Sequence, residues 1–146
     1  MNEKNLTKPC HFLNHDLLIV WKPEYDLGIS IVDEQHRGIV STINSLYYGM
    51  QNKHGDDVLI PTVHMIYEYT RIHFQTEEDL FRKCLFSGLQ EHIKLHDELT
   101  HTLHRVGNKS LWERDPEEFM KFLKTWWIEH ICHRDREVRD CLKGCK

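Results

Sequence analysis

The amino-acid sequence predicts an all-α protein, an up-down-up-down antiparallel four-helix bundle with an N-terminal arm. Three observations support this fold class. Apolar residues recur at spacings of three and four in four segments, which is the period of one helix face. The connections between the segments are short, which makes consecutive helices antiparallel neighbours, and no segment alternates as a strand does. The 146 residues fit one domain, with the arm expected over residues 1–30 and the bundle over 31–146.

The first two predicted helices carry polar residues among their apolar positions. The first series consists of Val32, His36, Ile39, Ile43, Leu46 and Met50. The second consists of Leu59, Val63, Ile66, Thr70, His73, Glu77, Leu80 and Cys84. Gly55 separates the two helices, and the stretch SGL over residues 87–89 ends the second. Trp21 and Tyr25 are expected to anchor the arm to the bundle.

The last two predicted helices repeat this mixture. The third series consists of Leu89, His92, His96, Leu99, Leu103 and Val106, and we expect it to end at Gly107 and Asn108. The fourth helix begins at DPEE, with Asp115 as N-cap and Pro116 in the first turn. Its series consists of Phe119, either Phe122 or Leu123, Trp126 and His130.

Composition excludes several classes of protein. The net charge is −4 with acids and bases mixed along the chain, whereas a nucleic-acid surface needs a basic stripe. No apolar run approaches the roughly 18 residues of a membrane span. The polar N-terminus has no apolar signal region, so we expect a cytoplasmic protein.

Five cysteines without a signal region favour reduced thiols over a disulfide framework. The sequence assigns no role to Cys10. Cys141 and Cys145, in CLKGCK, form either two exposed thiols or a local redox pair or weak metal site.

Histidine or glutamate occupies every one of the four series, where an ordinary bundle has leucine or isoleucine. The pairs His73/Glu77 and His92/His96 are four residues apart, which stacks two side chains on one helix face. A buried carboxylate costs several kcal/mol unless a positive partner compensates it. The pattern therefore predicts one cluster near the middle of the bundle, with a shared cation as the partner.

Some other polar residues point away from this cluster, and in the fourth helix two residues are alternative members of it. His64 and His101 are rotated about 180° and about 140° from the cluster face, and Glu78 about 100°, which suggests a surface acid. In HICHRD of the fourth helix, His133 lies about 60° from His130 and Asp135 about 140°. Ideal geometry slightly favours His133. Asp135 reaches the cluster only if the helix is distorted, for example by a π-bulge.

These residues resemble the hemerythrins, in particular the single-domain bacterial members, over residues 21–138. IVDEQH is similar to the family's first-ligand motif, and YTRIHFQTEEDL contains its His-Phe-x-x-Glu-Glu motif. WWIEHICHRD has the family's His-x-x-x-x-Asp spacing, which favours Asp135 over His133. The metal ligands that the resemblance implies are His36, His73, Glu77, His92, His96, His130 and Asp135.

The resemblance implies two iron ions as cofactor, bridged by Glu77, Asp135 and a solvent-derived hydroxo or oxo group. His92, His96 and His130 would hold one iron, and His36 and His73 the other, which keeps an open position. The implied function is reversible binding of dioxygen for carriage, storage or delivery. The implied dioxygen pocket consists of Ile39, Phe74, Trp126, Trp127 and Ile131. Trp127 stands where the family usually has leucine, and a larger side chain narrows or reshapes such a pocket.

Two other functions fit the same site. One is an oxygen or redox sensor module, and the other is a di-iron enzyme acting on dioxygen, peroxide or nitric oxide. Five imidazoles with only two carboxylates favour an oxygen-binding protein over an enzyme, because oxidases of the ferritin-like class use mainly carboxylates. A zinc-binding bundle is a further alternative. Dioxygen is the expected partner, nucleic acid is excluded, and the sequence does not identify any protein partner.

Overall fold

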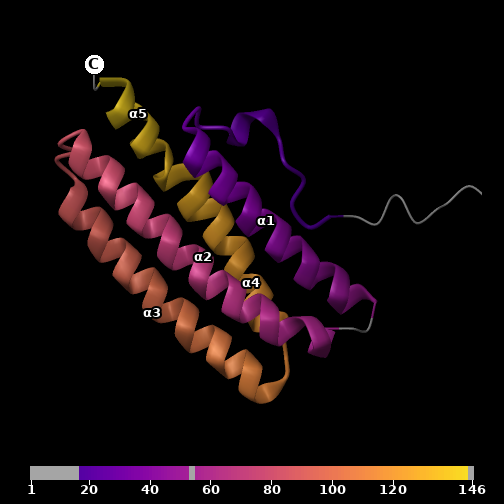
Figure 1. The fold of residues 1–146 in the computed structure, drawn as a ribbon. Coiled ribbons are helices and arrows are strands. Elements are labelled where there is room, and N and C mark those ends of the chain that lie inside the picture. The colour runs from indigo at the N-terminus through magenta and orange to yellow at the C-terminus, as the bar shows by residue number, and fades with distance from the viewer. Residues whose placement is uncertain (1–16, 53–54, 145–146) are drawn as a thin grey trace, which may run out of the picture.

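The computed structural model describes residues 17–52 and 55–144, and within these residues it contains helices and no strand. Four helical rods lie side by side (Figure 1). The first three are α1 (Ser30–Gln51), α2 (Gly55–Lys83) and α3 (Leu89–Glu113). The fourth rod consists of α4 (Glu117–Trp126), a π-helix (Trp127–Arg134) and α5 (Arg136–Gly144). The predicted all-α, antiparallel four-helix bundle is confirmed.

The rods enclose one core. Helix α1 packs against α2 and α4, α2 also packs against α3 and α5, and α3 packs against α4. The predicted apolar series face inward, and the fully buried side chains include Ile39, Ile43, Leu46, Val63, Ile66, Phe119 and Leu123. In the fourth helix Leu123 takes the core position, whereas Phe122 is only partly buried. Burial of each such side chain contributes about 1.5–3 kcal/mol.

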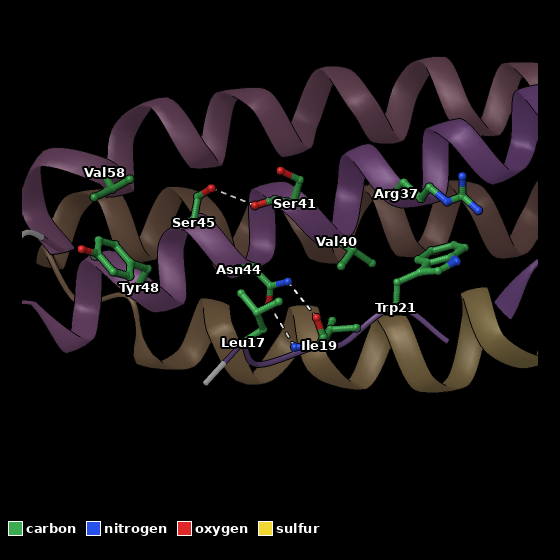
Figure 2. Close-up of a pocket in the computed structure, with 11 residues that line it drawn as sticks. Leu17, Ile19, Trp21, Arg37, Val40, Ser41, Asn44, Ser45, Tyr48 and Val58 are labelled. Carbon is green, nitrogen blue, oxygen red and sulfur yellow. Dashed lines mark hydrogen bonds between the residues drawn. The ribbon is translucent and has the colours of Figure 1, made fainter. Parts of the chain in front are cut away.

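The arm is fixed to α1 by its own backbone groups. The side chain of Asn44 donates to the carbonyl of Ile19 (2.8 Å) and accepts from its N–H (2.9 Å), as Figure 2 shows. The carboxylate of Asp33 accepts from the N–H groups of Leu27 (2.8 Å) and Gly28 (3.0 Å). Gly28 has φ +81°, a conformation that glycine adopts without strain, so the chain turns directly into α1.

Aromatic residues of the arm pack on the bundle, as the sequence predicts. Trp21 and Tyr25 contact each other and Trp127, with ring centroids 5.4–5.9 Å apart. The guanidinium of Arg37 lies 5.0 Å from the Trp21 ring. Helix α1 begins at Ser30. The division into a 1–30 arm and a 31–146 bundle stays a prediction, since residues 1–16 lie outside the described part of the chain.

Helix α3 does not end at Gly107 and Asn108, and that prediction is wrong. It continues to Glu113, where Arg114 takes the left-handed cap with φ 54°. Gly107 is instead a close contact between helices, because a Cβ there would lie 2.3 Å from Oη of Tyr67. The Tyr67 hydroxyl also donates to Asn108 (2.9 Å). The glycine therefore permits the approach of α2 and does not terminate α3.

The cysteines also differ from the prediction. Cys84, directly after α2, forms a disulfide with Cys141 of α5, with Cα atoms 6.2 Å apart. The expectation of reduced thiols is wrong for this pair, because packing brings together two cysteines that are 57 residues apart in sequence. Cys132 is free and half-buried. Cys10 and Cys145 lie outside the described residues.

Among residues 17–52 and 55–144, no helix is both long enough and apolar enough to cross a membrane.

Candidate metal centre

The four rods bring seven polar side chains together inside the bundle. Helix α1 contributes one residue, α2 and α3 two each, and the π-helical region two. All seven side chains are at most 4% exposed: His36, His73, Glu77, His92, His96, His130 and Asp135. They are the seven metal ligands that the sequence predicts. The cluster lies nearer the α2–α3 turn than the predicted middle of the bundle, since His92 and His96 fall within the first eight of the 25 residues of α3.

One group of side chains forms around two imidazoles. The Nε2 atoms of His36 and His73 lie 3.2 Å apart. Oδ2 of Asp135 lies 3.0 Å from the first and 3.1 Å from the second. Oε1 of Glu77 lies 3.4 Å from Nε2 of His73. The donor atoms of these four residues lie within 4.8 Å of one another, so the group is able to hold a metal ion.

A second group forms around three imidazoles. Oε2 of Glu77 lies 3.5 Å from Nε2 of His92 and 3.3 Å from Nε2 of His96. Oδ1 of Asp135 lies 3.0 Å from Nε2 of His130. The donor atoms of these five residues also lie within 4.8 Å of one another.

The two carboxylates belong to both groups. Glu77 turns Oε1 toward His73 and Oε2 toward His92 and His96. Asp135 likewise turns Oδ2 toward the pair of imidazoles and Oδ1 toward His130. Two carboxylates that each present one oxygen to each side form the arrangement that bridges two neighbouring cations.

The donor atoms fit cations, because many of them lack any other partner. Both oxygens of Glu77 and Oδ1 of Asp135 are buried without a hydrogen bond, as are the Nε2 atoms of His92, His96 and His130. Buried polar atoms are almost always paired, since an orphan costs about 1–3 kcal/mol. Cations at the two positions would satisfy all six atoms at once. Mixed imidazole and carboxylate donors suit several first-row transition metals, iron and zinc among them.

The electrostatics of the cluster keep its carboxylates ionised. Burial acts to raise the pKa of Asp135, but the nearby imidazoles, above all His130, hold this pKa well below its usual value. Burial and Asp135 act to raise the pKa of Glu77, yet the nearby imidazoles of His73, His92 and His96 lower it. Burial acts to lower the pKa of His73, but Glu77 and Asp135 outweigh it and raise the pKa. The cluster is thus a buried site with anionic oxygens.

A distorted helix decides between the two candidates in HICHRD. Residues Trp127–Arg134 form a π-helix, and the N–H of Asp135 bonds to the carbonyl of His130, five residues back (3.1 Å). This wider turn points Asp135 into the cluster with no exposed surface, while His133 faces solvent. The sequence-based hypothesis of a π-distortion is confirmed. The preference of ideal geometry for His133 is wrong.

Two residues outside the predicted set hold the imidazoles in place. Nδ1 of His96 donates to Glu78 (2.9 Å), whose side chain is only 16% exposed. Nδ1 of His73 donates to Oε1 of Gln35 (3.1 Å). The interpretation of Glu78 as a surface acid is therefore wrong, because a rotation of about 100° from Glu77 points it toward α3 and not toward solvent. One signal in the sequence could have pointed to these two residues. Gln35 directly precedes the cluster residue His36, and Glu78 directly follows Glu77.

The aromatic and aliphatic residues predicted to line a dioxygen pocket are all buried. Phe74 stacks on His96 with ring centroids 3.7 Å apart. Trp127 meets His36 edge-on at 6.2 Å, between the cluster and the arm. The exposed fractions are at most 5% for Ile39, Phe74, Trp126, Trp127 and Ile131. The role of these residues as a dioxygen pocket stays a prediction.

A groove on the described part of the surface lies elsewhere. It measures about 770 Å³ and runs between the arm and α1 (Figure 2). Two of its polar side chains are already engaged, since Asn44 holds Ile19, and Arg37 bonds to Asp26 (2.7 Å) and Glu34 (3.3 Å). None of the seven cluster residues lines it. The groove therefore reflects how the arm docks and is not part of the centre.

Fold and site together define a class of protein, a helical bundle whose core carries imidazoles and carboxylates able to hold metal. The family model for the hemerythrin HHE cation binding domain matches residues 27–142. The chain belongs to the hemerythrin family.

The relatives that resemble this chain in sequence are hemerythrins or hemerythrin-like proteins as well. A bacteriohemerythrin of Clostridium acetobutylicum is 30% identical over 129 residues, covering 84% of this chain and 100% of that protein. A bacteriohemerythrin of Stenotrophomonas maltophilia is 28% identical over 87% of this chain and 83% of its own length. A hemerythrin-like protein of Naegleria gruberi is 27% identical, covering 84% of this chain and 92% of its own length.

Proposed function

We propose that this chain is a non-haem di-iron protein that binds dioxygen reversibly, for carriage, storage or delivery. The observation that carries the proposal is the pair of shared carboxylates, because each turns one oxygen toward each imidazole group. Membership of the hemerythrin family and the similarity to bacteriohemerythrins support iron as the metal.

In this proposal the two imidazole groups hold one iron each. His92, His96 and His130 bind the first, His36 and His73 bind the second, and Glu77 and Asp135 bridge the two. When bound, the pair of irons supplies the two-electron redox chemistry that dioxygen requires. The group with only two imidazoles has one protein ligand fewer, which leaves room for a small molecule, since open coordination positions are the ones that take substrates.

The surrounding side chains exclude water from the site. Phe74 covers one face of His96, and Trp127 covers His36 on the side of the arm. With Ile39, Trp126 and Ile131 they form an apolar wall, in which electrostatic interactions are stronger than in water. We propose that this wall restricts access to small, uncharged molecules such as dioxygen.

The experiment is anaerobic loading with ferrous iron, followed by metal analysis and optical spectra. We expect two irons per chain and a visible absorption band that develops with dioxygen and disappears when dioxygen is removed. Asp135→Asn is the matched variant, and we expect it to lose at least one iron. A folded protein that takes up no iron, or a band that never reverses, contradicts the proposal.

The same samples test the alternative functions. Sustained consumption of dioxygen, peroxide or nitric oxide by the loaded protein would instead identify an enzyme. The cytoplasmic location expected from the sequence belongs to this proposal as well. The redox state of Cys84 and Cys141 in intact cells tests it, since disulfides persist mainly in oxidising compartments.

A further inference from the structure

The Cys84–Cys141 disulfide joins the end of α2, the helix that carries Glu77, to α5, which begins directly after Asp135. Glu77 lies seven residues before Cys84, and Asp135 lies six residues before Cys141. At 1.5 Å per residue both separations are about 10 Å, or two helical turns. The bond therefore fixes α2 and α5 to each other close to the cluster. Four cluster residues lie in the loop that it closes: His92, His96, His130 and Asp135.

Helix α5 has few other means of holding its place. It forms the last nine described residues of the fourth rod, and the ends of helices fray more readily than their interiors. Val138 is its only buried residue, at 0% exposure. Arg136 donates to the carbonyls of Cys132 (2.8 Å) and Glu24 (3.0 Å) at the start of the helix. Apart from the buried Val138 and the hydrogen bonds of Arg136, α5 is held against the end of α2 by the disulfide.

The two cysteines lie where a reductant can reach them. Both residues are only half-buried, at the end of the bundle where α2 stops and α5 passes. Exchange with a thiol requires such access to a sulfur atom. A cysteine pair fully enclosed in the core would not meet this requirement.

We propose that Cys84–Cys141 is a thiol–disulfide exchange site, through which a dithiol reductant loosens α5 and weakens metal retention at the cluster. This inference rests on the proposed metal centre, whose regulation it describes. One thiolate of the reductant attacks a sulfur of the disulfide and forms a mixed disulfide, while the other cysteine leaves as a thiol. The second thiol of the reductant then displaces the remaining cysteine. The disulfide gains two electrons and two protons, the dithiol loses them, and the reverse exchange restores the bond.

Asp135 is the residue that connects the disulfide to the centre. It precedes α5 directly, and its position depends on the π-helix that ends at Arg134. If α5 undocks, the backbone on one side of Asp135 loses its support. Asp135 then holds its two oxygens less firmly between His36, His73 and His130, and release of the metals becomes faster.

The test compares metal release from the oxidised and the reduced protein. One sample is reduced with dithiothreitol, which is removed anaerobically before both samples are loaded with ferrous iron and mixed with a chelator. We expect release to be at least tenfold faster after reduction. The double variant Cys84→Ser/Cys141→Ser should release iron like the reduced protein and show no effect of dithiothreitol. Cys132→Ser, which removes the free cysteine of the described residues, should behave like the unchanged chain.

A second measurement separates failure of this inference from failure of the proposed function. Amide exchange over residues 136–144 should increase on reduction, in metal-free and loaded protein alike. Equal release rates from the two loaded samples overturn the exchange site and leave the metal centre intact. A chain that binds no iron in either state overturns the metal centre instead. If the double serine variant does not fold, the reduced unchanged chain still decides the outcome.

Discussion

The imidazoles of the cluster differ in the charge of the residue behind them. Nδ1 of His96 bonds to the carboxylate of Glu78, whereas Nδ1 of His73 bonds to the neutral amide of Gln35. A hydrogen bond to a carboxylate fixes the orientation of an imidazole and makes its other nitrogen a stronger donor to a metal. Glu78 thus prepares His96 more strongly than Gln35 prepares His73.

Replacement of Glu78 tests this positioning role. We expect Glu78→Gln to lower the metal affinity of the three-imidazole group by about tenfold, and Glu78→Ala by up to about a hundredfold, because outer partners of metal ligands have effects of this size. Competition with a chelator measures the affinity. Glu98→Gln on the exposed side of α3 is the control and should leave it unchanged. An equal affinity for Glu78→Ala and the unchanged chain would show that the contact does not matter.

At the scale of single elements, the π-helix converts an unfavourable spacing into a favourable one. In an ideal α-helix a residue five positions after His130 lies about 140° away, and a residue four positions after it lies about 40° away. The bond from the N–H of Asp135 to the carbonyl of His130 accommodates one extra residue in the turn. Asp135 then points as the fourth residue of a regular turn would.

Deletion of His133 should therefore preserve the centre. The variant removes one residue, whose side chain is exposed, and places Asp135 four residues after His130, so a regular α-helix directs the carboxylate into the cluster. We expect it to retain both metals, whereas Asp135→Asn loses at least one. Metal analysis after desalting measures this, and a crystal structure would show the straightened helix. Loss of metal equal to that of Asp135→Asn would mean that the π-helix itself is required.

The sequence predicted those helices in which apolar residues recur at regular spacings. The inward positions of α1 and α2 follow directly from spacings of three and four, and the cluster residues occupy those same positions. The sequence failed where tertiary contact decides the outcome. Gly107 has the residue type of a helix end, but Tyr67 needs the space beside it. The partner of Cys84 lies 57 residues away, a distance that no local pattern encodes.

For the whole molecule, the cluster makes folding and metal binding one equilibrium. The buried donor atoms that have no hydrogen-bond partner destabilise the folded protein as long as no metal is bound. A ligand that binds only the folded chain stabilises it by RT ln(1 + [L]/Kd), about 2.7 kcal/mol at a free concentration one hundred times Kd. We expect the unfolding free energy to rise by this amount for each metal site that is filled at that metal concentration. Denaturant titrations with and without metal measure it. Coincident titration curves would show that the cluster does not couple metal to folding.

The disulfide constrains the unfolded chain across the same part of the molecule. Closure of a loop between residues 57 positions apart stabilises the folded state by about 4 kcal/mol in the chain-entropy model. We expect reduction of the metal-free protein to lower its unfolding free energy by about that amount, as measured by denaturant titration before and after dithiothreitol. Cys132→Ser should respond to dithiothreitol in the same way, because the disulfide is intact in that variant. A change below about 1 kcal/mol would contradict this expectation and would mean that residual structure in the unfolded chain already restricts the loop.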